Sequence, residues 1–452
     1  MSMHKTVVID IVGLSARLIG EHTPFIRDWA AKRQLSAIRP MLPAVTTAVQ
    51  STYVTGKWPS THGVVGNGWY DRSDCEIKFW KQANTLVQAE KIWEKAKRED
   101  PSFTCSKMFW WYNMYSTADY SVTPRPQYRA DGLKIPDCYA HPSQLRDRLQ
   151  KELGQFPLFH FWGPAADIRS SRWIAEASMK VDTWHDPTLT LIYLPHLDYC
   201  LQKYGPDLSR VAGELREIDE VVADLVRFYE KKDARILLLS EYGITSVNHP
   251  VHLNRIFRKH GLISVREENG LELLDAAACK AFAVADHQIA HVYINDPSCE
   301  KEVRNILEST PGIGQLLDAE GKRQHHLDHH RSGDYVAVAD EKSWFTYYYW
   351  QDDRKAPDYA RVVDIHRKPG YDPVEMFMSS KLRAAYKLLR KKLGLRYVMD
   401  VIPLDATLVR GSHGRVAASS ADHPVLIGTL AEDKAVYSPV DIRELIWQQL
   451  VS

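Results

Sequence analysis

The chain has 452 residues, of which 44% are hydrophobic and 25% are charged. This length can bury a large core in one large α/β domain or two smaller ones, and the composition is typical of a globular enzyme. The formal net charge of +1 argues for neither nucleic acid nor membrane as a partner, and the sequence has no run of about 18 apolar residues that would span a bilayer.

The N-terminus, Met1 to Lys5, leads straight into the short apolar run of the first predicted strand. It lacks the long apolar region and the cleavage site of a signal peptide. The six cysteines are scattered and form no Cys-x-x-Cys pair, a pattern typical of reduced, packed cysteines. We therefore expect a cytoplasmic protein.

Short apolar runs alternate with helical patterns, which predicts an α/β fold with a largely parallel central sheet and helices on both faces. Residues 6–9 are the first predicted strand, and Asp10 follows it. Residues 189–194 and 235–239 are two further strands, and the apolar spacing of residues 208–231 predicts a helix between them. This unit places Asp198 and Glu241 just after the carboxyl ends of its strands, where ligand sites of such sheets lie.

Two aromatic-rich regions are predicted as cap-like insertions in a single domain over residues 1–452. The first spans about residues 105–175 and the second about residues 343–405. Because loops at the carboxyl edge of a sheet usually carry function, these insertions are candidates to cover the active site and contact the substrate. For any single aromatic side chain, we expect a place in the core.

Residues 380–393 combine basic and apolar residues at helical spacing. We expect a solvated helix that packs on the domain through its leucines. Contact with a membrane surface or an anionic partner is the alternative.

The segment from Pro43 to Asn67 carries most of the functional information. Thr46 lies nine residues before the threonine of the turn Thr55-Gly56, and a His-Gly-Val-Val-Gly-Asn segment ends at Asn67. A hydroxyl is a weak nucleophile near neutral pH and needs a base or a metal ion to activate it. The Thr46 hydroxyl, the Asp10 carboxylate and the Asn67 amide are the parts of a site for metal-assisted phosphoryl transfer.

This arrangement resembles the nucleotide pyrophosphatase/phosphodiesterase branch of the alkaline phosphatase superfamily, and the resemblance covers most of the chain. It implies an alkaline-phosphatase-like fold, Thr46 as nucleophile, and Asn67 as the amide that stabilises the transferred group. It also implies two metal ions, Zn²⁺ in the family. Later segments match the family motifs in order, and the positions of the metal ligands are then occupied by Asp10, Thr46, Asp198, Gln202, Glu241 and His413.

Three positions depart from the family pattern. Gln202 and Tyr242 stand where the family has histidine, and Glu241 stands where it has aspartate. The resulting oxygen-rich set favours Mn²⁺ or Mg²⁺ over Zn²⁺, so we expect one or two divalent ions without a fixed identity. The favoured replacement ligand is His366, and the other candidates are His196, His249, His252, His287 and Asp364.

The leading hypothesis is a metal-dependent phosphodiesterase or nucleotide pyrophosphatase that works through a covalent phosphoryl-threonine at Thr46, with a small phosphoester as substrate. A basic side chain of the insertions, such as Lys368, is a candidate for contact with a substrate phosphate. The first alternative is a phosphomonoester or phosphonate hydrolase, although the absence of Arg and Lys between Pro43 and Gly56 favours diesters over monoesters. The second is a pseudoenzyme or binding protein with a degraded metal site. The substrate and the oligomeric state are left open.

Overall fold

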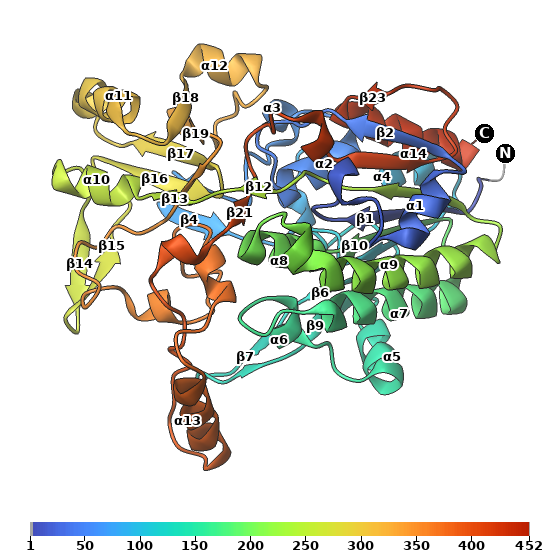
Figure 1. Ribbon diagram of the computed structural model, residues 1–452, viewed down its shortest axis with the longest axis horizontal. Coiled ribbons are helices and arrows are strands. Elements are labelled where there is room, and N and C mark those ends of the chain that lie inside the picture. The colour runs from blue at the N-terminus through green and yellow to red at the C-terminus, as the bar shows by residue number, and fades with distance from the viewer. Residues whose placement is uncertain (1–2, 452) are drawn as a thin grey trace.

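The computed structural model describes residues 3–451, which form a mixed α/β fold around a nine-stranded central sheet (Figure 1). The strand order is β23-β2-β22-β11-β1-β10-β5-β6-β9. Strands β11, β1, β10, β5 and β6 are parallel, whereas β22 and β9 run antiparallel to their neighbours. The predicted largely parallel sheet is therefore confirmed. In chain order the strands are β1 (Thr6–Ile11), β2 (Gln34–Ile38), β5 (Cys105–Met108), β6 (Tyr120–Pro124), β9 (Cys138–His141), β10 (Leu189–Leu194), β11 (Arg235–Leu239), β22 (Val425–Gly428) and β23 (Val436–Tyr437).

Helices cover both faces of this sheet. The long helices α7 (Ile168–His185) and α9 (Leu208–Glu230) lie on one face, and α2 (Thr46–Thr55) and α14 (Ile442–Val451) lie on the other (Figure 1). The central strands are consequently buried on both sides, which explains their continuous apolar sequences. The predicted strands at 189–194 and 235–239 and the helix between them are confirmed.

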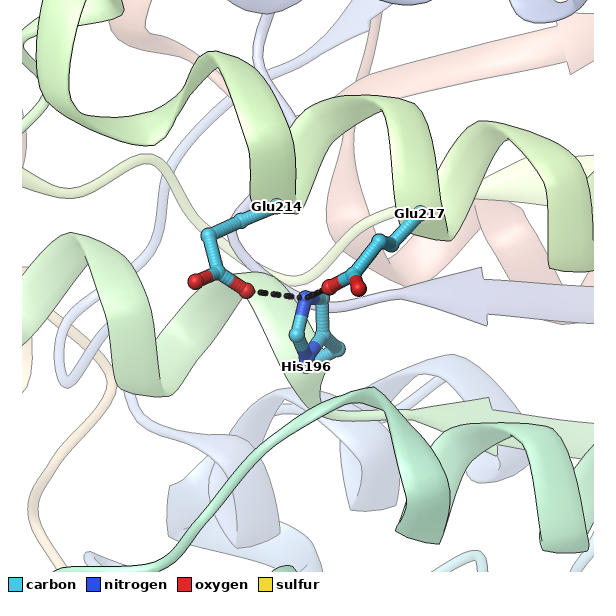
Figure 2. Close-up of side chains that lie close together, drawn as sticks. All are labelled: His196, Glu214 and Glu217. Carbon is cyan, nitrogen blue, oxygen red and sulfur yellow. Dashed lines mark ion pairs between the residues drawn. The ribbon is translucent and has the colours of Figure 1, made fainter.

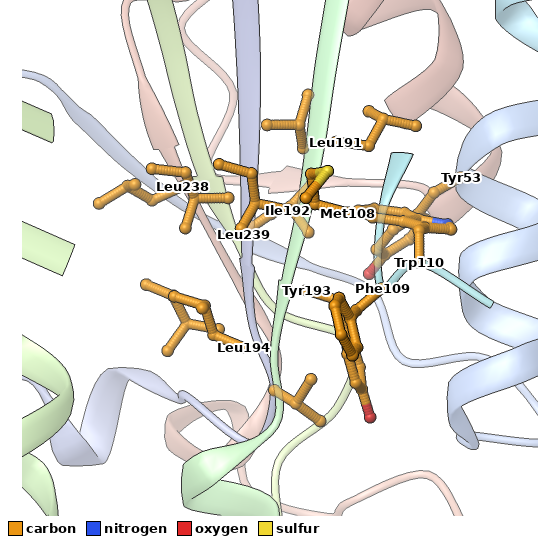
Figure 3. Close-up of a cluster of buried hydrophobic side chains, with 14 of the residues drawn as sticks. Tyr53, Met108, Phe109, Trp110, Leu191, Ile192, Tyr193, Leu194, Leu238 and Leu239 are labelled. Carbon is orange, nitrogen blue, oxygen red and sulfur yellow. The ribbon is translucent and has the colours of Figure 1, made fainter. Parts of the chain in front are cut away.

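The main core fills the layer around β10, β11 and β5. Leu191, Ile192 and Leu238 are fully buried there, and Tyr53 of α2 reaches the same layer (Figure 3). The Tyr53 hydroxyl donates a hydrogen bond to the Ser240 carbonyl at 2.9 Å, directly after β11. This packing fixes α2 against the carboxyl ends of the strands.

Helix α2 explains the spacing between Thr46 and Thr55. Thr46 is its first residue and Thr55 its last, and all ten side chains are buried. Gly56 ends the helix with φ +63°, a left-handed conformation that favours glycine. The predicted Thr-Gly turn is thus a helix C-terminus, and Thr46 begins a fully buried helix.

A second, smaller sheet was not predicted. It has four antiparallel strands in the order β16-β17-β19-β18 and its own apolar core (Figure 1). A two-residue turn, His287-Gln288, joins β16 to β17, and its backbone is bonded to that of His413. The unit consists of β16 (Ala281–Asp286), β17 (Ile289–Ile294), β18 (Ile313–Leu317), β19 (Tyr335–Ala339), α10 (Leu253–Lys259), α11 (Glu300–Ser309) and α12 (Ala319–Gln324).

The predicted insertions are only partly separate from the sheet. Residues 105–175 supply β5, β6 and β9, so this part is integral to the central sheet, whereas β7 (Gln127–Tyr128) and β8 (Lys134–Ile135) form a small hairpin outside it. In residues 343–405, Trp344 and the four aromatics from Tyr347 to Trp350 are buried in one apolar cluster and Phe345 in the core of the second sheet, so these aromatics belong to the core. A single catalytic domain stays a prediction.

Helix α13 (Lys381–Lys392) corrects one expectation. It was predicted to pack through its leucines, yet Ala384 is the one buried residue in this fully described helix. Figure 1 shows it at the end of a protrusion.

Among residues 3–451, no helix combines the length and apolar character needed to cross a bilayer. The remaining strands and α-helices are β3 (Gly68–Asp71), β4 (Glu76–Phe79), β12 (Thr245–Ser246), β13 (His249–Val251), β14 (Val265–Glu268), β15 (Leu271–Leu274), β20 (Ser343–Phe345), β21 (Gly411–Ser412), α1 (Pro24–Ala30), α3 (Pro59–His62), α4 (Ile92–Glu99), α5 (Gln144–Leu153), α6 (Leu158–Phe161) and α8 (His196–Tyr204).

Candidate active site

The predicted site residues meet at the carboxyl ends of β1, β10 and β11. They are connected through short polar contacts, and each is at most 6% exposed to solvent. The side chains brought together are those of Asp10, Thr46, Asn67, Asp198, Gln202, Glu241 and His413.

Asp10 on β1 and Glu241, two residues after the end of the adjacent strand β11, form a buried carboxyl pair. The Gln50 amide nitrogen donates to Glu241 Oε1 at 2.6 Å and to Asp10 Oδ2 at 3.4 Å, and its oxygen accepts from the Trp111 N–H at 2.7 Å. Burial, and then the charge of Glu241, raise the pKa of Asp10 well above its ordinary value. Burial also raises the pKa of Glu241. Two such carboxyls need a cation or a shared proton to offset their charge.

The Thr46 hydroxyl lies between this pair and a tyrosine. Its Oγ1 atom is 2.8 Å from the Tyr242 hydroxyl. It also lies close enough to Glu241 to offset part of the rise that burial causes in the pKa of that carboxyl. Thr46 is also the first residue of α2, where the helix dipole favours negative charge. The hydroxyl is therefore placed where an attacking oxygen can be activated.

Asn67 is held rigidly beside Thr46. Its side-chain oxygen accepts from the Thr47 N–H at 3.1 Å, and its amide nitrogen donates to Asp286 Oδ1 at 3.1 Å. The Asn67 backbone N–H also donates to Asp286 Oδ2, at 2.8 Å. The amide NH₂ carries two hydrogens, and the bond to Asp286 uses one of them.

A hydrogen-bonded network occupies the other side of the site. The Tyr242 hydroxyl donates to Asp198 Oδ1 at 3.3 Å, and the Gln202 amide donates to Asp198 Oδ2 at 2.9 Å. Gln202 Oε1 accepts from the Tyr371 hydroxyl at 2.9 Å. The Tyr242 ring stacks on His413 with centroids 3.7 Å apart, and His413 Nε2 lies 3.5 Å from Asp198 Oδ1. Both departures from histidine are thus engaged in bonds with neighbouring side chains.

The loop that carries Glu241 and Tyr242 requires its glycine. A Cβ atom on Gly243 would lie 1.8 Å from the Asp422 carbonyl oxygen. Glycine at this position therefore lets the loop pass close to the C-terminal segment, and the carboxyl and the phenol are presented from one rigid turn.

His287 enters the site from the second sheet. Its Nδ1 atom lies 2.7 Å from Asp286 Oδ1, and its ring contacts Tyr371 and His413 with centroids 3.6 Å and 3.8 Å away. Burial, followed by the charge of His413, lowers the pKa of His287 to about 4, so its ring is neutral near pH 7. Of the histidines proposed as replacement ligands, His287 is the one at the site.

The other proposed replacements bond elsewhere. The ring of His366, the favoured candidate, faces the Phe79 carbonyl at 3.3 Å. His249 bonds to Ser343, and His252 bonds to Thr346.

Lys368 was a candidate for contact with a substrate phosphate, but it is buried. Its ammonium lies 2.7 Å from both Asp372 and Glu375. These two carboxyls satisfy its charge inside the fold, so its expected role does not hold in this structure.

His196 lies in a separate cluster with Glu214 and Glu217 (Figure 2). Its Nε2 atom is 2.8 Å from Glu214 Oε2 and 3.6 Å from Glu217 Oε2. Within residues 3–451, this is the one group of three His, Cys, Asp or Glu donor atoms that all lie within 4.8 Å of one another. Because the imidazole points at α9, two residues before Asp198, the contact holds α8 on α9 and so fixes the helix that carries Asp198.

The carboxyl pair fits one divalent ion. No hydrogen-bond donor in the described part of the chain reaches Asp10 Oδ1 or Glu241 Oε2, although both atoms are fully buried. Together with the neighbouring Thr46 hydroxyl they form an oxygen-only donor set, which suits Mg²⁺ or Mn²⁺ better than Zn²⁺. An ion there would offset the two negative charges.

The second family position does not fit an ion. Both oxygens of Asp198 are hydrogen-bonded, the Gln202 oxygen is bonded to Tyr371, and the Tyr242 ring covers one face of His413. Only His413 Nε2 and His287 Nε2 lack a hydrogen bond there, counting partners among residues 3–451. The hydrogen-bonded side chains of Tyr242, Gln202 and Tyr371 fill this second ion position.

Three site residues were not predicted: Gln50, Asp286 and Tyr371. Gln50 lies four residues after Thr46, one helical turn along the same face, so its place could have been found once α2 was recognised. Asp286 and Tyr371 come from distant segments. The polar triplet Asp286-His287-Gln288 between two apolar strands was the available signal for the first of these.

The fold and the site together define an alkaline-phosphatase-like protein with a threonine at the head of a buried helix. The model of the family described as "Type I phosphodiesterase / nucleotide pyrophosphatase" matches residues 6–372 of the chain. The chain therefore belongs to this family, as the sequence motifs predicted.

Curated relatives agree with this assignment. Ectonucleotide pyrophosphatase/phosphodiesterase 2 of Saccharomyces cerevisiae is 23% identical over 390 residues, which cover 80% of this chain and 68% of that protein. An uncharacterised pyrophosphatase/phosphodiesterase of Schizosaccharomyces pombe is 25% identical over 269 residues, which cover 56% of this chain and 47% of that protein. The chain thus spans about half the length of this second relative.

Solved structures share the fold. Murine ectonucleotide pyrophosphatase/phosphodiesterase 5, an inactive variant in complex with AMP, superposes with a TM-score of 0.60 at 14% identity, covering 99% of this chain and 94% of that one. Phosphonoacetate hydrolase from Sinorhizobium meliloti 1021, in complex with phosphonoformate, superposes with a TM-score of 0.61 at 14% identity, covering 99% and 96%.

Proposed function

We propose that this protein hydrolyses small phosphodiesters, with Thr46 as the nucleophile and a covalent phosphoryl-threonine as the intermediate. The observation that carries the proposal is the place of the Thr46 hydroxyl, between a buried carboxyl pair and the Tyr242 phenol. Family membership supports the reaction class, and AMP and phosphonoformate in the two solved structures are ligands of the phosphorus oxyanion type that we propose for this site.

Tyr242 is placed to receive the proton of Thr46. The Thr46 hydroxyl faces the phenolic oxygen at 2.8 Å, and the phenolic hydrogen is directed at Asp198 Oδ1. Burial, followed by the charges of Asp198 and Glu241, raises the pKa of Tyr242 well above its ordinary value, so the phenol stays protonated. As the Thr46 oxygen bonds to phosphorus, the bond from phosphorus to the leaving alcohol breaks and the leaving oxygen takes a proton from solvent. In the same step the Thr46 proton moves to the Tyr242 oxygen while the Tyr242 proton moves to Asp198, and water then releases the phosphoryl group from Thr46.

Asn67 and α2 are placed to stabilise the transferred group. The Asn67 side chain is bonded to the N–H of Thr47, the residue after the attacking Thr46, and keeps one amide hydrogen beyond its bond to Asp286. This hydrogen and the positive end of the α2 dipole would stabilise the negative charge that develops on the phosphoryl oxygens. Asp10, Glu241 and Thr46 would hold one divalent ion. When bound, such an ion supplies Lewis-acid activation of the hydroxyl and charge compensation.

The proposal is tested by turnover of bis(p-nitrophenyl) phosphate after EDTA treatment and addition of Mg²⁺, Mn²⁺ or Zn²⁺. We expect activity with Mg²⁺ or Mn²⁺ above that with Zn²⁺, since the donor set is oxygen-only. Absence of turnover with all three ions on this diester and on a nucleotide diester would contradict the proposal.

Two alternatives have specific support. The likeness to phosphonoacetate hydrolase favours a phosphonate as substrate, so phosphonoacetate belongs in the same assay. The network of Tyr242, Gln202 and Tyr371 at the second ion position favours a binding protein that has lost catalysis. Bound ligand without turnover would favour that second alternative.

We expect the network to be the reason that a second ion is excluded. In the double variant Tyr242→His/Gln202→His, two imidazoles replace the phenol and the amide beside Asp198 and His413, which gives a nitrogen-rich set suited to Zn²⁺. Bound Zn²⁺, measured by elemental analysis after dialysis, is expected to rise by about one ion per chain. The control variant Tyr371→Phe removes a hydroxyl from the same network without adding a ligand, and an equal rise there would contradict the explanation.

We also propose a cytoplasmic location, because all six cysteines, each within the described residues, are free thiols.

A further inference from the structure

Helix α13 carries an uncovered apolar stripe. Leu382, Tyr386, Leu389 and Leu393 recur at the i, i+4, i+7 and i+11 spacing of one helical face. They are 85%, 55%, 53% and 64% exposed. The side of the helix that meets the rest of the protein is a different one, since it carries the buried Ala384.

Positive charge borders this stripe on both sides. At 3.6 residues per turn, Arg383 and Arg390 lie along one edge of the stripe and Lys381 and Lys392 along the other. Residues 381–399 contain seven Lys and Arg and no Asp or Glu. Asp400 pairs with Arg383 and Lys387, so the net charge of the protrusion stays strongly positive.

The protrusion is a closed excursion of the chain. The Ser379 N–H donates to the Val401 carbonyl at 2.8 Å, which ties the two ends of the segment together. Beyond the helix, Leu395 and Val398 are each 51% exposed and extend the apolar surface. The segment therefore projects as one unit from a fixed base, as Figure 1 shows for α13.

We propose that α13 docks this protein on an anionic lipid bilayer. The apolar stripe would enter the boundary between headgroups and acyl chains, and the flanking lysines and arginines would contact lipid phosphates. A narrow apolar stripe between two rows of cations matches the layered chemistry of such a surface. The inference stands independently of the catalytic proposal, because no residue of α13 belongs to the candidate site.

Charge argues against a second copy of the chain as the occupant. Two α13 helices packed stripe to stripe would bring the basic borders of one copy against those of the other, and like charges at close range repel. An anionic surface instead pairs with Lys381, Arg390 and Lys392, the flanking cations that Asp400 does not engage. The membrane is therefore the occupant to which the proposal commits.

The test is flotation of the full-length protein with lipid vesicles. We expect binding to phosphatidylcholine vesicles that contain about 30% phosphatidylglycerol, weak binding to pure phosphatidylcholine, and a marked loss of binding as NaCl is raised from about 0.05 M to about 0.5 M. Absence of binding to the anionic vesicles at low salt would overturn the proposal.

Two neighbouring leucines provide a matched pair of variants. Leu389→Gln removes a residue of the stripe, whereas Leu388→Gln changes an equally exposed leucine on another side of the helix. We expect Leu389→Gln to weaken the partition constant about fivefold or more and Leu388→Gln less than about twofold. Equal loss in both variants would contradict the assigned face. If the wild type fails to bind vesicles and forms dimers in sedimentation velocity that Leu389→Gln dissociates, the stripe would be assigned to a second copy of the chain instead. Thermal unfolding and turnover of a soluble diester check that both variants stay intact.

Discussion

Thr46→Ala is expected to lower kcat/KM for a phosphodiester by a factor of about 10³ or more. The change removes the one oxygen that lies beside the Glu241 carboxyl and within 2.8 Å of the Tyr242 hydroxyl. A water molecule in the space of the hydroxyl would not be fixed at the head of a buried helix. Steady-state rates of wild type and variant, with the same divalent ion, measure the effect.

Two controls separate chemistry from packing in this experiment. Thr46→Ser keeps a hydroxyl and is expected to retain most of the activity. Thr47→Ala removes the next hydroxyl of α2, which donates to the Gly66 carbonyl at 2.8 Å, and is expected to cost less than about tenfold. Mass spectrometry of acid-quenched wild type should find the transferred group on the peptide that contains Thr46. Undiminished turnover by Thr46→Ala, in protein free of contaminating phosphodiesterase, would remove Thr46 from the mechanism.

The central sheet was predictable because its signals are local. Strands β1, β10 and β11 are continuous apolar runs, and the helix α9 has clear helical spacing between two of them. The second sheet lacked such signals. Its β16–β17 hairpin turns at His287-Gln288, with His287 at φ +62°, and uses none of the Asn-Gly or Gly pairs that mark a hairpin in sequence.

The part of the site that lies in short sequence motifs was predictable. The family resemblance of the motifs around Asp10, Thr46 and Asn67 implied a shared site before the fold was known, whereas the partners of the altered positions depend on tertiary contacts. Tyr371 reaches Gln202 from 169 residues away, and no local pattern announces that bond. The substitution of histidine by Tyr242 was visible, but its hydrogen bond to Thr46 was not.

Helix α13 shows a further limit of sequence patterns. Its periodicity correctly predicted a helix with an apolar face, but periodicity does not say what covers that face. The expectation that the domain covers it was wrong, because the leucines of the stripe point away from the body of the protein.

Glu241→Gln is expected to change ion binding and stability in opposite directions. The amide can accept from Gln50 as Glu241 Oε1 does, while its NH₂ faces Asp10 in place of a second carboxylate. The loss of one anionic donor should weaken the affinity for Mg²⁺ or Mn²⁺ by about 100-fold or more, measured by calorimetric titration. The same change should stabilise the ion-free protein at pH 8 by about 1–3 kcal/mol, since it removes the repulsion between two buried carboxylates.

The pH dependence fixes the sign of the stability effect. In wild type the pKa values of Asp10 and Glu241 are raised by burial, so between the unfolded values near 4 and the raised folded values the folded state binds more protons than the unfolded state. The contribution of this pair to the free energy of unfolding is therefore favourable at low pH and is lost as pH rises through the folded pKa values. The advantage of Glu241→Gln over ion-free wild type should accordingly grow from pH 5 to pH 8.

Added ion should then reverse the order of the two proteins. Saturating Mg²⁺ or Mn²⁺ binds the folded wild type and raises its melting temperature at pH 8, while Glu241→Gln gains little. Glu241→Asp keeps the carboxylate and should respond to the ion as wild type does. If wild type gains nothing from any divalent ion and still becomes less stable from pH 5 to pH 8, the pair holds a proton at low pH and no cation. The carboxyl pair would then support the binding-protein alternative, because the remaining Thr46–Tyr242–Asp198 chain can move a proton but cannot offset the charge of a phosphoryl group.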